Sequence, residues 1–229
     1  MSHRNYRVVI LAVALLIIGN RGLCAAQFSQ RPSARKADTQ EWNDVQVAIP
    51  VSKSADLLVL GTLRLGQNVT SPAEERIGGG FNFRIKKYVY LTPTYEYVRT
   101  QPGGGRKGNE HRLSVAATFR RPLEQFTISD RNLIERRIRD PQLDSFRYRN
   151  RFQIERPLKV GGLRVLGYVS DEIFYESSLN RWVRNQFTAG VSRRFSKHFV
   201  QDFYYARQND AYTRPGDLNV IGTVLRIRL

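Results

Sequence analysis

The sequence predicts an all-β protein, an antiparallel up-and-down transmembrane β-barrel. Three observations predict this fold. Apolar and polar residues alternate along many segments, and short and longer connections alternate between those segments. After the first 26 residues, no segment is long and apolar enough for a membrane-spanning helix. A chain of 229 residues is long enough for one such domain.

The start of the chain has the pattern of a cleaved secretion signal. Two arginines precede an almost unbroken apolar run over residues 8–18, and small residues follow it. The run is too short to span a bilayer comfortably as a helix. We therefore expect cleavage after Ala26, which divides the chain into a signal peptide at 1–26, a polar N-terminal segment at 27–41 and an outer-membrane β-barrel at 42–229.

The cysteine and histidine content argues against redox and metal chemistry. Cys24 lies in the predicted signal, and the residues before it, Arg21 and Leu23, do not fit a lipoprotein signal. Without Cys24 the mature chain has no cysteine, and its histidines are His111 and His198. We therefore expect no disulfide, no metal site and no other cofactor.

The predicted mature chain is strongly basic. Three of the 37 basic residues leave with the signal, which leaves 34 against 20 acidic residues. Such an excess favours anionic partners. Because the chain is expected to be exported, nucleic acid is excluded, and the expected partners are outer-membrane lipid, lipopolysaccharide and small anionic solutes.

Period-2 alternation predicts eleven strands. Leu113 and Val115, for example, alternate with Arg112 and Ser114, which places one set of side chains on each face of a sheet. The segment 125–138 also fits a basic amphipathic helix, but its apolar residues fit period 2 as well. The expected strands are 42–52, 55–65, 75–85, 88–99, 110–120, 125–138, 144–156, 163–175, 182–195, 198–207 and 218–229.

The connections alternate between tight turns, such as 53–54, and longer loops, such as 100–109. Outer-membrane barrels have this rhythm, with short periplasmic turns and long outer loops. Aromatic residues near strand ends, such as Tyr88 and Trp182, fit the girdles of such barrels. The alternative is a soluble periplasmic β-sandwich or lipocalin-like barrel, which turns its apolar face inward.

An odd number of strands conflicts with the even number found in bacterial single-chain barrels. A cryptic strand before Trp42 would give twelve strands, and a first segment outside the wall would give ten; we expect about twelve. The last strand ends in the apolar residue Leu229, where such barrels commonly have an aromatic residue. We expect the barrel-assembly machinery to bind this strand.

Five short blocks of residues resemble an outer-membrane family labelled domain of unknown function 2490. They are Arg147–Phe152, Glu172–Phe174, Arg184–Phe187 with Gly190, Tyr204–Arg207 and Asn219–Gly222. Their order fits the strand pattern over nearly all of the chain after about Trp42. The resemblance implies a membrane barrel and no activity. Together with the secretion signal, it predicts the outer membrane of a Gram-negative bacterium.

Three arginines alternate along one predicted strand and therefore share one face. Neighbours in this set are about 7 Å apart. A lipid-facing arginine at mid-bilayer costs about 2–4 kcal/mol, so this face is expected to line the lumen. The same alternation predicts the lumen-lining residues Arg147, Arg149, Arg151, Glu155, Glu172 and Arg184.

These residues are consistent with two functions. A continuous arginine row would form a narrow anion-preferring pore, since guanidinium groups match carboxylate and phosphate oxygens. Interleaved glutamates would instead plug the lumen and give a non-conducting structural or surface-interaction barrel. A third function, a lipid-modifying enzyme, would need a partner for His111. Ser114 lies on the opposite face of that strand, so we expect no enzyme.

Overall fold

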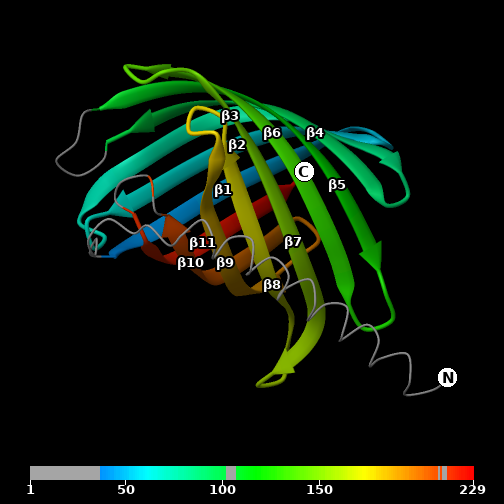
Figure 1. Cartoon of the computed structure of the whole chain (residues 1–229). Coiled ribbons are helices and arrows are strands. Elements are labelled where there is room, and N and C mark those ends of the chain that lie inside the picture. The colour runs from blue at the N-terminus through cyan, green and yellow to red at the C-terminus, as the bar shows by residue number, and fades with distance from the viewer. Residues whose placement is uncertain (1–36, 102–106, 211, 213–215) are drawn as a thin grey trace. The chain divides into compact units, whose positions relative to one another are not determined.

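The structure is a computed structural model that describes residues 37–101, 107–210, 212 and 216–229, and these form one closed β-barrel (Figure 1). None of these residues forms a helix that is long and apolar enough to cross a membrane. The strands are β1 (Asp38–Ser52), β2 (Ala55–Gly66), β3 (Ser71–Lys86), β4 (Val89–Thr100), β5 (Gly108–Pro122), β6 (Thr127–Asp140), β7 (Ser145–Val160), β8 (Leu163–Glu176), β9 (Arg181–Arg194), β10 (Phe199–Asp210) and β11 (Leu218–Arg228).

The described barrel has eleven strands, so the expectation of about twelve, or alternatively ten, is wrong. The barrel closes because β1 pairs with β11 in parallel, from Asp38 opposite Leu218 to Ala48 opposite Arg228. In a chain of hairpins, the first and last strands of an odd set run in the same direction. Closure without a twelfth strand therefore requires one parallel pair, and the other ten pairs are antiparallel.

Side chains strengthen this parallel seam. The Thr223 hydroxyl donates to Asn43 Oδ1 at 2.7 Å. Near the other end of the seam, Arg228 donates two hydrogen bonds to the Asp56 carboxylate, at 3.0 and 2.7 Å. These contacts join residues more than 170 positions apart in the sequence.

The eleven predicted segments correspond to the eleven strands, with small shifts at their ends. The segment that also fitted a helix is strand β6. β1 begins at Asp38, four residues before the predicted start, because the polar residues 38–41 pair with β11. The predicted signal peptide lies outside the described residues, so it and cleavage after Ala26 stay predictions.

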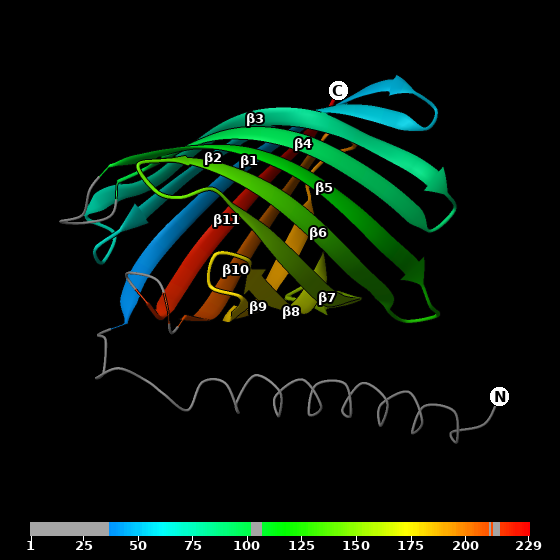
Figure 2. The ribbon, with the colours of Figure 1, turned by 45° about the horizontal axis from the view of Figure 1, so that its top comes forward.

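The two ends of the barrel differ. At one end, which we call the turn end, five connections of two to four residues join the strands, and β11 finishes there. At the other, the loop end, five connections of four to seven residues join the strands, and β1 starts there. In Figure 2 the turn end lies towards the right and the start of β1 at the lower left.

Most of the exposed large apolar side chains face outward, and the most deeply buried charged side chains face inward. Ile77, Ile134 and Ile221 on the outer wall are 67%, 59% and 62% exposed, whereas the inward Arg112 and Glu135 are each 2% exposed. A soluble barrel would show the opposite arrangement, because water would surround the outer wall. An apolar outer band with a polar interior is typical of outer-membrane barrels.

Candidate functional site

The alternation of β7 turns Arg147, Arg149 and Arg151 to one side, towards the lumen. Arg149 and Arg151 line the lumen cavity described below. Arg147 lies closer to the loop end, where its side chain is 10% exposed. The outward neighbours on the same strand include Phe146, which is 50% exposed. The period-2 pattern of β7 therefore separates a lipid-compatible face from a cationic face.

Glutamates of the neighbouring strands lie between these arginines. Glu135 of β6 and Glu176 of β8 are both register partners of Arg147, and their carboxylate oxygens lie 3.9 and 3.0 Å from its guanidinium nitrogens. Arg149 contacts Glu135 at 3.3 Å and Glu172 at 2.9 Å. Because carboxylates separate these arginines, β7 does not present a continuous arginine row.

The ion pairs near the loop end form a closed ring of three arginines and three glutamates. Each arginine contacts two glutamates, and each glutamate contacts two of these arginines. We call this set the ion ring. In order around it, with each distance measured to the residue named before, the members are Glu135, Arg112 (4.0 Å), Glu110 (2.8 Å), Arg137 (2.7 Å), Glu176 (3.0 Å) and Arg147 (3.0 Å). Arg147 contacts Glu135 at 3.9 Å and so closes the ring. Charges removed from water are stable only when paired in this way.

The rest of the lumen at this level is also filled. Trp42, Ala206, Leu218 and Val220 form a buried apolar cluster beside the seam. Every strand contributes an inward side chain that is buried or ion-paired. We call this set the closed layer: Gln40, Trp42, Arg64, Glu74, Arg76, Val98, the ion ring, Phe174, Val183, Arg184, Ala206, Gln208, Asp210, Leu218 and Val220.

Aromatic rings of the closed layer contact arginines of the same layer and of the adjoining cavity wall. The Arg64 guanidinium lies 3.7 Å from the ring centre of Trp42. The guanidinium groups of Arg149 and Arg184 lie 4.7 and 5.2 Å from the ring of Phe174. Arg184 also contacts Asp210 at 2.7 Å. Cation–π contacts of this kind are stronger when the cation is desolvated, so they favour a dry layer.

The lumen is open towards the turn end. The inward arginines there, Arg120, Arg226 and Arg228, have side-chain exposures of 48%, 45% and 51%. In the closed layer, Arg112 and Arg137 have exposures of 3% and 11%. Between these levels lies a cavity of about 700 Å³, lined by residues of all eleven strands. Its volume is within the usual range for small-molecule sites.

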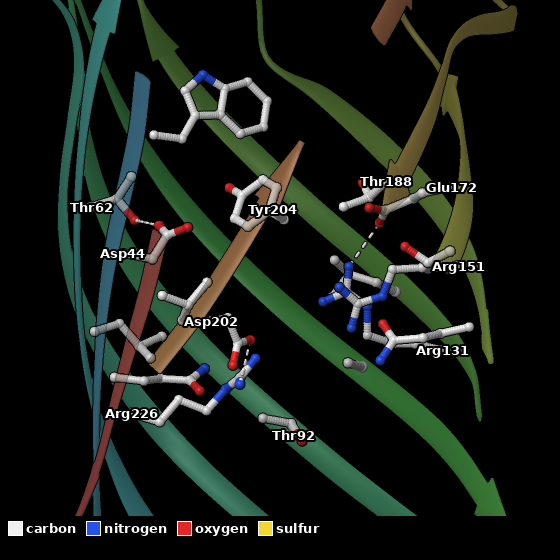
Figure 3. A pocket seen from close by; sticks show the side chains of 18 of the residues that line it. Asp44, Thr62, Thr92, Arg131, Arg151, Glu172, Thr188, Asp202, Tyr204 and Arg226 are labelled. Atoms are coloured by element: carbon white, nitrogen blue, oxygen red, sulfur yellow. Dashed lines mark hydrogen bonds and ion pairs between the residues drawn. The ribbon is translucent and has the colours of Figure 1, made fainter. Parts of the chain in front are cut away.

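Two arginines lie side by side on the wall of this cavity. Arg131 of β6 and Arg151 of β7 are register partners, so their like charges are directly opposite (Figure 3). Arg131 contacts Glu172 at 2.7 Å, but its Nε is buried without a hydrogen-bond partner. Arg151 has no ion pair with any residue that the structure describes. Opposed like charges destabilise a sheet, and an anion between them would relieve the repulsion.

The other predicted lumen residues are divided between the two levels. Glu172 lines the cavity and accepts hydrogen bonds from Arg131 and Arg149. Glu155 also lines it and pairs with Arg120 at 2.5 Å. Arg184 lies in the closed layer. A path for solutes along these residues stays a prediction.

Sequence reasoning missed Glu110, Glu135 and Glu176, which complete the ion ring. A signal for Glu135 was present, since it alternates with Arg131 and Arg137 on the polar face of the predicted strand 125–138. Glu110 also alternates with its partner Arg112 on one strand, but its second partner Arg137 lies 27 positions away. For Glu176 the missing information was the register between strands, because its arginine partners lie 29 and 39 positions away.

His111 lies on the outer wall at the loop end and has no catalytic partner among its described neighbours. Its Nδ1 is 2.8 Å from the Tyr95 hydroxyl, and its ring packs against Tyr97. Its register partners are Tyr97 and Ile138, while Ser114 faces the cavity. The described residues also contain no group of three or more His, Cys, Asp or Glu that could hold a metal ion.

The family model described as "Protein of unknown function (DUF2490)" matches residues 39–219. This range includes ten strands completely or nearly so and the first residues of β11. The match bears out the resemblance of the sequence blocks. Among curated proteins, no sequence matches this chain.

Three solved outer-membrane structures are similar in part. LpxR from Salmonella typhimurium matches with a TM-score of 0.47 and 8% identity, covering 75% of this chain and 83% of its own. The KdgM porin in complex with disordered oligogalacturonate matches with a TM-score of 0.44 and 9% identity, covering 77% and 92%. The anion-selective porin from Comamonas acidovorans matches with a TM-score of 0.36 and 12% identity, covering 73% and 56%.

Proposed function

We propose that this protein, which belongs to the DUF2490 family of proteins of unknown function, is an outer-membrane barrel that does not conduct solutes. The observation that carries this proposal is the closed layer, to which all eleven strands contribute buried or ion-paired side chains. A water-filled path through this level would leave its lining side chains exposed, as Arg120 and Arg226 are at the turn end.

Electrostatics supports the same proposal. A buried ion pair gains little over apolar packing, but breaking one leaves an uncompensated charge, which is strongly destabilising. The ion ring links six charges, so a solute could pass only if several pairs separated together. The ring therefore acts as a stiff plug and not as a row of exchangeable anion sites.

In this proposal the loop end faces the outside of the cell and the turn end faces the periplasm, because outer-membrane barrels place long loops outside. The barrel then has a structural or surface-interaction role, with lipopolysaccharide around its outer half and the assembly machinery as the partner of β11. We further propose that it is not an enzyme. His111 supports this, because its side chain packs on tyrosines of the outer wall.

Planar-bilayer conductance of the refolded protein under a salt gradient tests the proposal. We expect a folded barrel that inserts and shows no discrete conductance steps. Heat-modifiable migration on a gel confirms that the same sample is folded. Regular anion-selective or cation-selective steps from that sample would refute a closed lumen.

A second candidate function, a narrow anion-preferring pore, is favoured by one observation. Arg151 lines the cavity without an ion pair to a described residue, beside the second cation Arg131. If steps are seen, this candidate predicts anion selectivity that falls in an Arg151→Ser variant. Unchanged selectivity in that variant would exclude the arginine pair as the selective site.

A further inference from the structure

The basic charge of the barrel is concentrated at the turn end. The stretches of chain there (50–57, 84–91, 120–129, 155–166, 192–201 and 226–229) contain three acidic residues, Asp56, Glu124 and Glu155. They contain fourteen basic residues, which we call the basic rim: Lys53, Arg84, Lys86, Lys87, Arg120, Arg121, Arg156, Lys159, Arg164, Arg193, Arg194, Lys197, Arg226 and Arg228.

The remainder of the described barrel is nearly balanced. It contains fifteen basic and seventeen acidic residues. The excess of eleven positive charges at the turn end, fourteen basic against three acidic residues, therefore accounts for the whole positive charge of the described barrel. This concentration of positive charge is not required by the fold, because the remainder of the described barrel forms the same strands with nearly balanced charge.

Eleven of the fourteen residues of the basic rim have no ion pair with a described residue. Among its fourteen members, Arg120, Arg226 and Arg228 form ion pairs with described residues. In the remainder of the described barrel, ten of the fifteen basic residues form ion pairs: Arg64, Arg76, Arg112, Arg131, Arg136, Arg137, Arg147, Arg149, Arg184 and Arg207. The charges of the rim must therefore be balanced from outside the described chain.

Several rim side chains lie on aromatic rings of the turns. Arg156 lies 5.3 Å from the ring centre of Phe126, and Arg193 lies 4.6 Å from that of Phe195. Phe195 is 53% exposed, and apolar residues beside the rim such as Val160 are 59% exposed. A mixture of exposed aromatic, aliphatic and basic side chains suits the level of lipid headgroups, where apolar stems are buried and charged ends reach phosphates.

We propose that the basic rim binds the headgroups of anionic phospholipids in the leaflet that the short turns face. The lipid phosphates supply the counterions that the rim lacks, while the exposed aromatic and aliphatic side chains enter the adjacent acyl region. This lipid contact fixes the depth of the turn end in the membrane. It does not depend on whether the lumen conducts.

The test variant uses three rim arginines that the strand alternation places on the outer face of the barrel. Arg121, Arg156 and Arg193 are changed together to Gln, which removes three charges without ion-pair partners among the described residues. The matched control changes Arg99, Lys107 and Arg181 to Gln, which removes three charges near the loop end that likewise have no ion-pair partner among the described residues. A further variant with Lys at positions 121, 156 and 193 retains the charge.

Binding of phosphatidylglycerol to the folded barrel in detergent is measured by native mass spectrometry, with phosphatidylcholine and inorganic phosphate as comparison ligands. Each basic residue near a membrane surface strengthens anionic lipid binding by about fivefold. The Gln variant loses three such residues and is therefore expected to bind phosphatidylglycerol at least about fivefold more weakly, even if only one of them contacts the bound lipid. The control and Lys variants are expected to retain wild-type binding.

Equal losses in the Gln and control variants would show that net charge alone attracts the lipid and would overturn the proposal. Inorganic phosphate that binds the rim as tightly as phosphatidylglycerol would overturn it as well. If the Gln variant does not fold, the wild-type protein decides the question. Equal affinity of the wild-type protein for phosphatidylglycerol and phosphatidylcholine at low salt would then contradict the rim as a lipid site.

Discussion

Among the acidic residues that the structure describes, Glu135 contacts the largest number of arginines. It is 2% exposed and lies within 4.0 Å of guanidinium nitrogens of Arg112, Arg147 and Arg149. One of its oxygens, Oε2, has no hydrogen-bond partner, so the carboxylate is held mainly by charge. Three largely buried cations around one buried anion make the anion important, because little water is available to solvate the cations in its place.

We therefore expect a Glu135→Gln variant to lose about 3 kcal/mol of unfolding free energy. In this variant Arg112, Arg147 and Arg149 each lose one of their two carboxylate partners and keep the other. Urea unfolding of the barrel in lipid vesicles measures this loss. The matched control is Glu124→Gln, an exposed turn residue without an ion pair in the described barrel, which is expected to be neutral. Equal stabilities of the two variants would contradict the role of the ion ring.

The inward direction of individual side chains could be predicted from the sequence, but their partners could not. Period 2 places Arg147 and Arg149 on the same face as soon as β7 is recognised. Whether the lumen beside that face is open or filled depends on the acidic side chains of the neighbouring strands. Strand register decides which acidic side chains these are. Glu110 and Arg137, for example, are 27 positions apart and meet only because β5 and β6 pair with their observed offset.

At the scale of elements, β3 shows why one strand carries three consecutive glycines. Glycine inside a strand is typical of a bend or a close backbone approach, and at residues 78–80 the structure shows a close approach. A Cβ on Gly80 would lie 2.2 Å from the carbonyl oxygen of Pro93, and one on Gly78 would lie 2.2 Å from that of Tyr95. The obstacle is the backbone of β4, which cannot move aside without separating the strands.

A Gly80→Ala variant is therefore expected to destabilise the barrel by about 1–3 kcal/mol, the usual range for overpacking. Gly61→Ala provides the control, because a Cβ there would meet no atom within 4 Å. Both variants replace a strand glycine with alanine, so the effect of strand propensity on stability is the same in both and cancels when they are compared. Urea midpoints of the two variants in vesicles should differ; identical midpoints would mean that β3 and β4 separate easily.

The parallel seam is the element that sequence reasoning did not predict. All eleven segments were recognised, but an even strand number was expected from the barrels that are known, and parallel closure was not considered. Nothing in a single strand's alternation reveals the direction of its neighbour. The observed pairing places Asn43 opposite Thr223 with their side chains in hydrogen-bond contact.

An engineered disulfide tests this pairing. With Cys24 replaced by Ser, an Asn43→Cys/Thr223→Cys variant is expected to cross-link under mild oxidation and to migrate differently on a non-reducing gel. Asn43→Cys/Ile227→Cys, offset by four positions, is expected to cross-link far less. Equal cross-linking of both pairs, or of neither, would contradict the direct contact of β1 with β11 and would favour an additional strand between them.

The whole molecule is polarised along its axis. The loop end is filled by paired charges and apolar side chains, whereas the turn end is open, solvent-accessible and rich in unpaired cations. The net positive charge was evident from composition, but its concentration at the turn end appears only when all five turns are brought together. A ligand that enters the cavity would therefore arrive from the turn end, and electrostatic attraction would favour an anion.

One-sided labelling of a cysteine in the cavity tests the closed lumen most directly. Ser192 lines the cavity, and Ser178 lies exposed in the connection between β8 and β9 at the loop end. In cells that carry Ser192→Cys with Cys24 replaced by Ser, a bulky thiol reagent that cannot cross the outer membrane is added before and after the periplasm is opened. Ser178→Cys, the control, should react in intact cells and so verify that the loops face outside. We predict that Ser192→Cys reacts only after the periplasm is opened; equally fast labelling of both cysteines in intact cells would mean that the loop end is open.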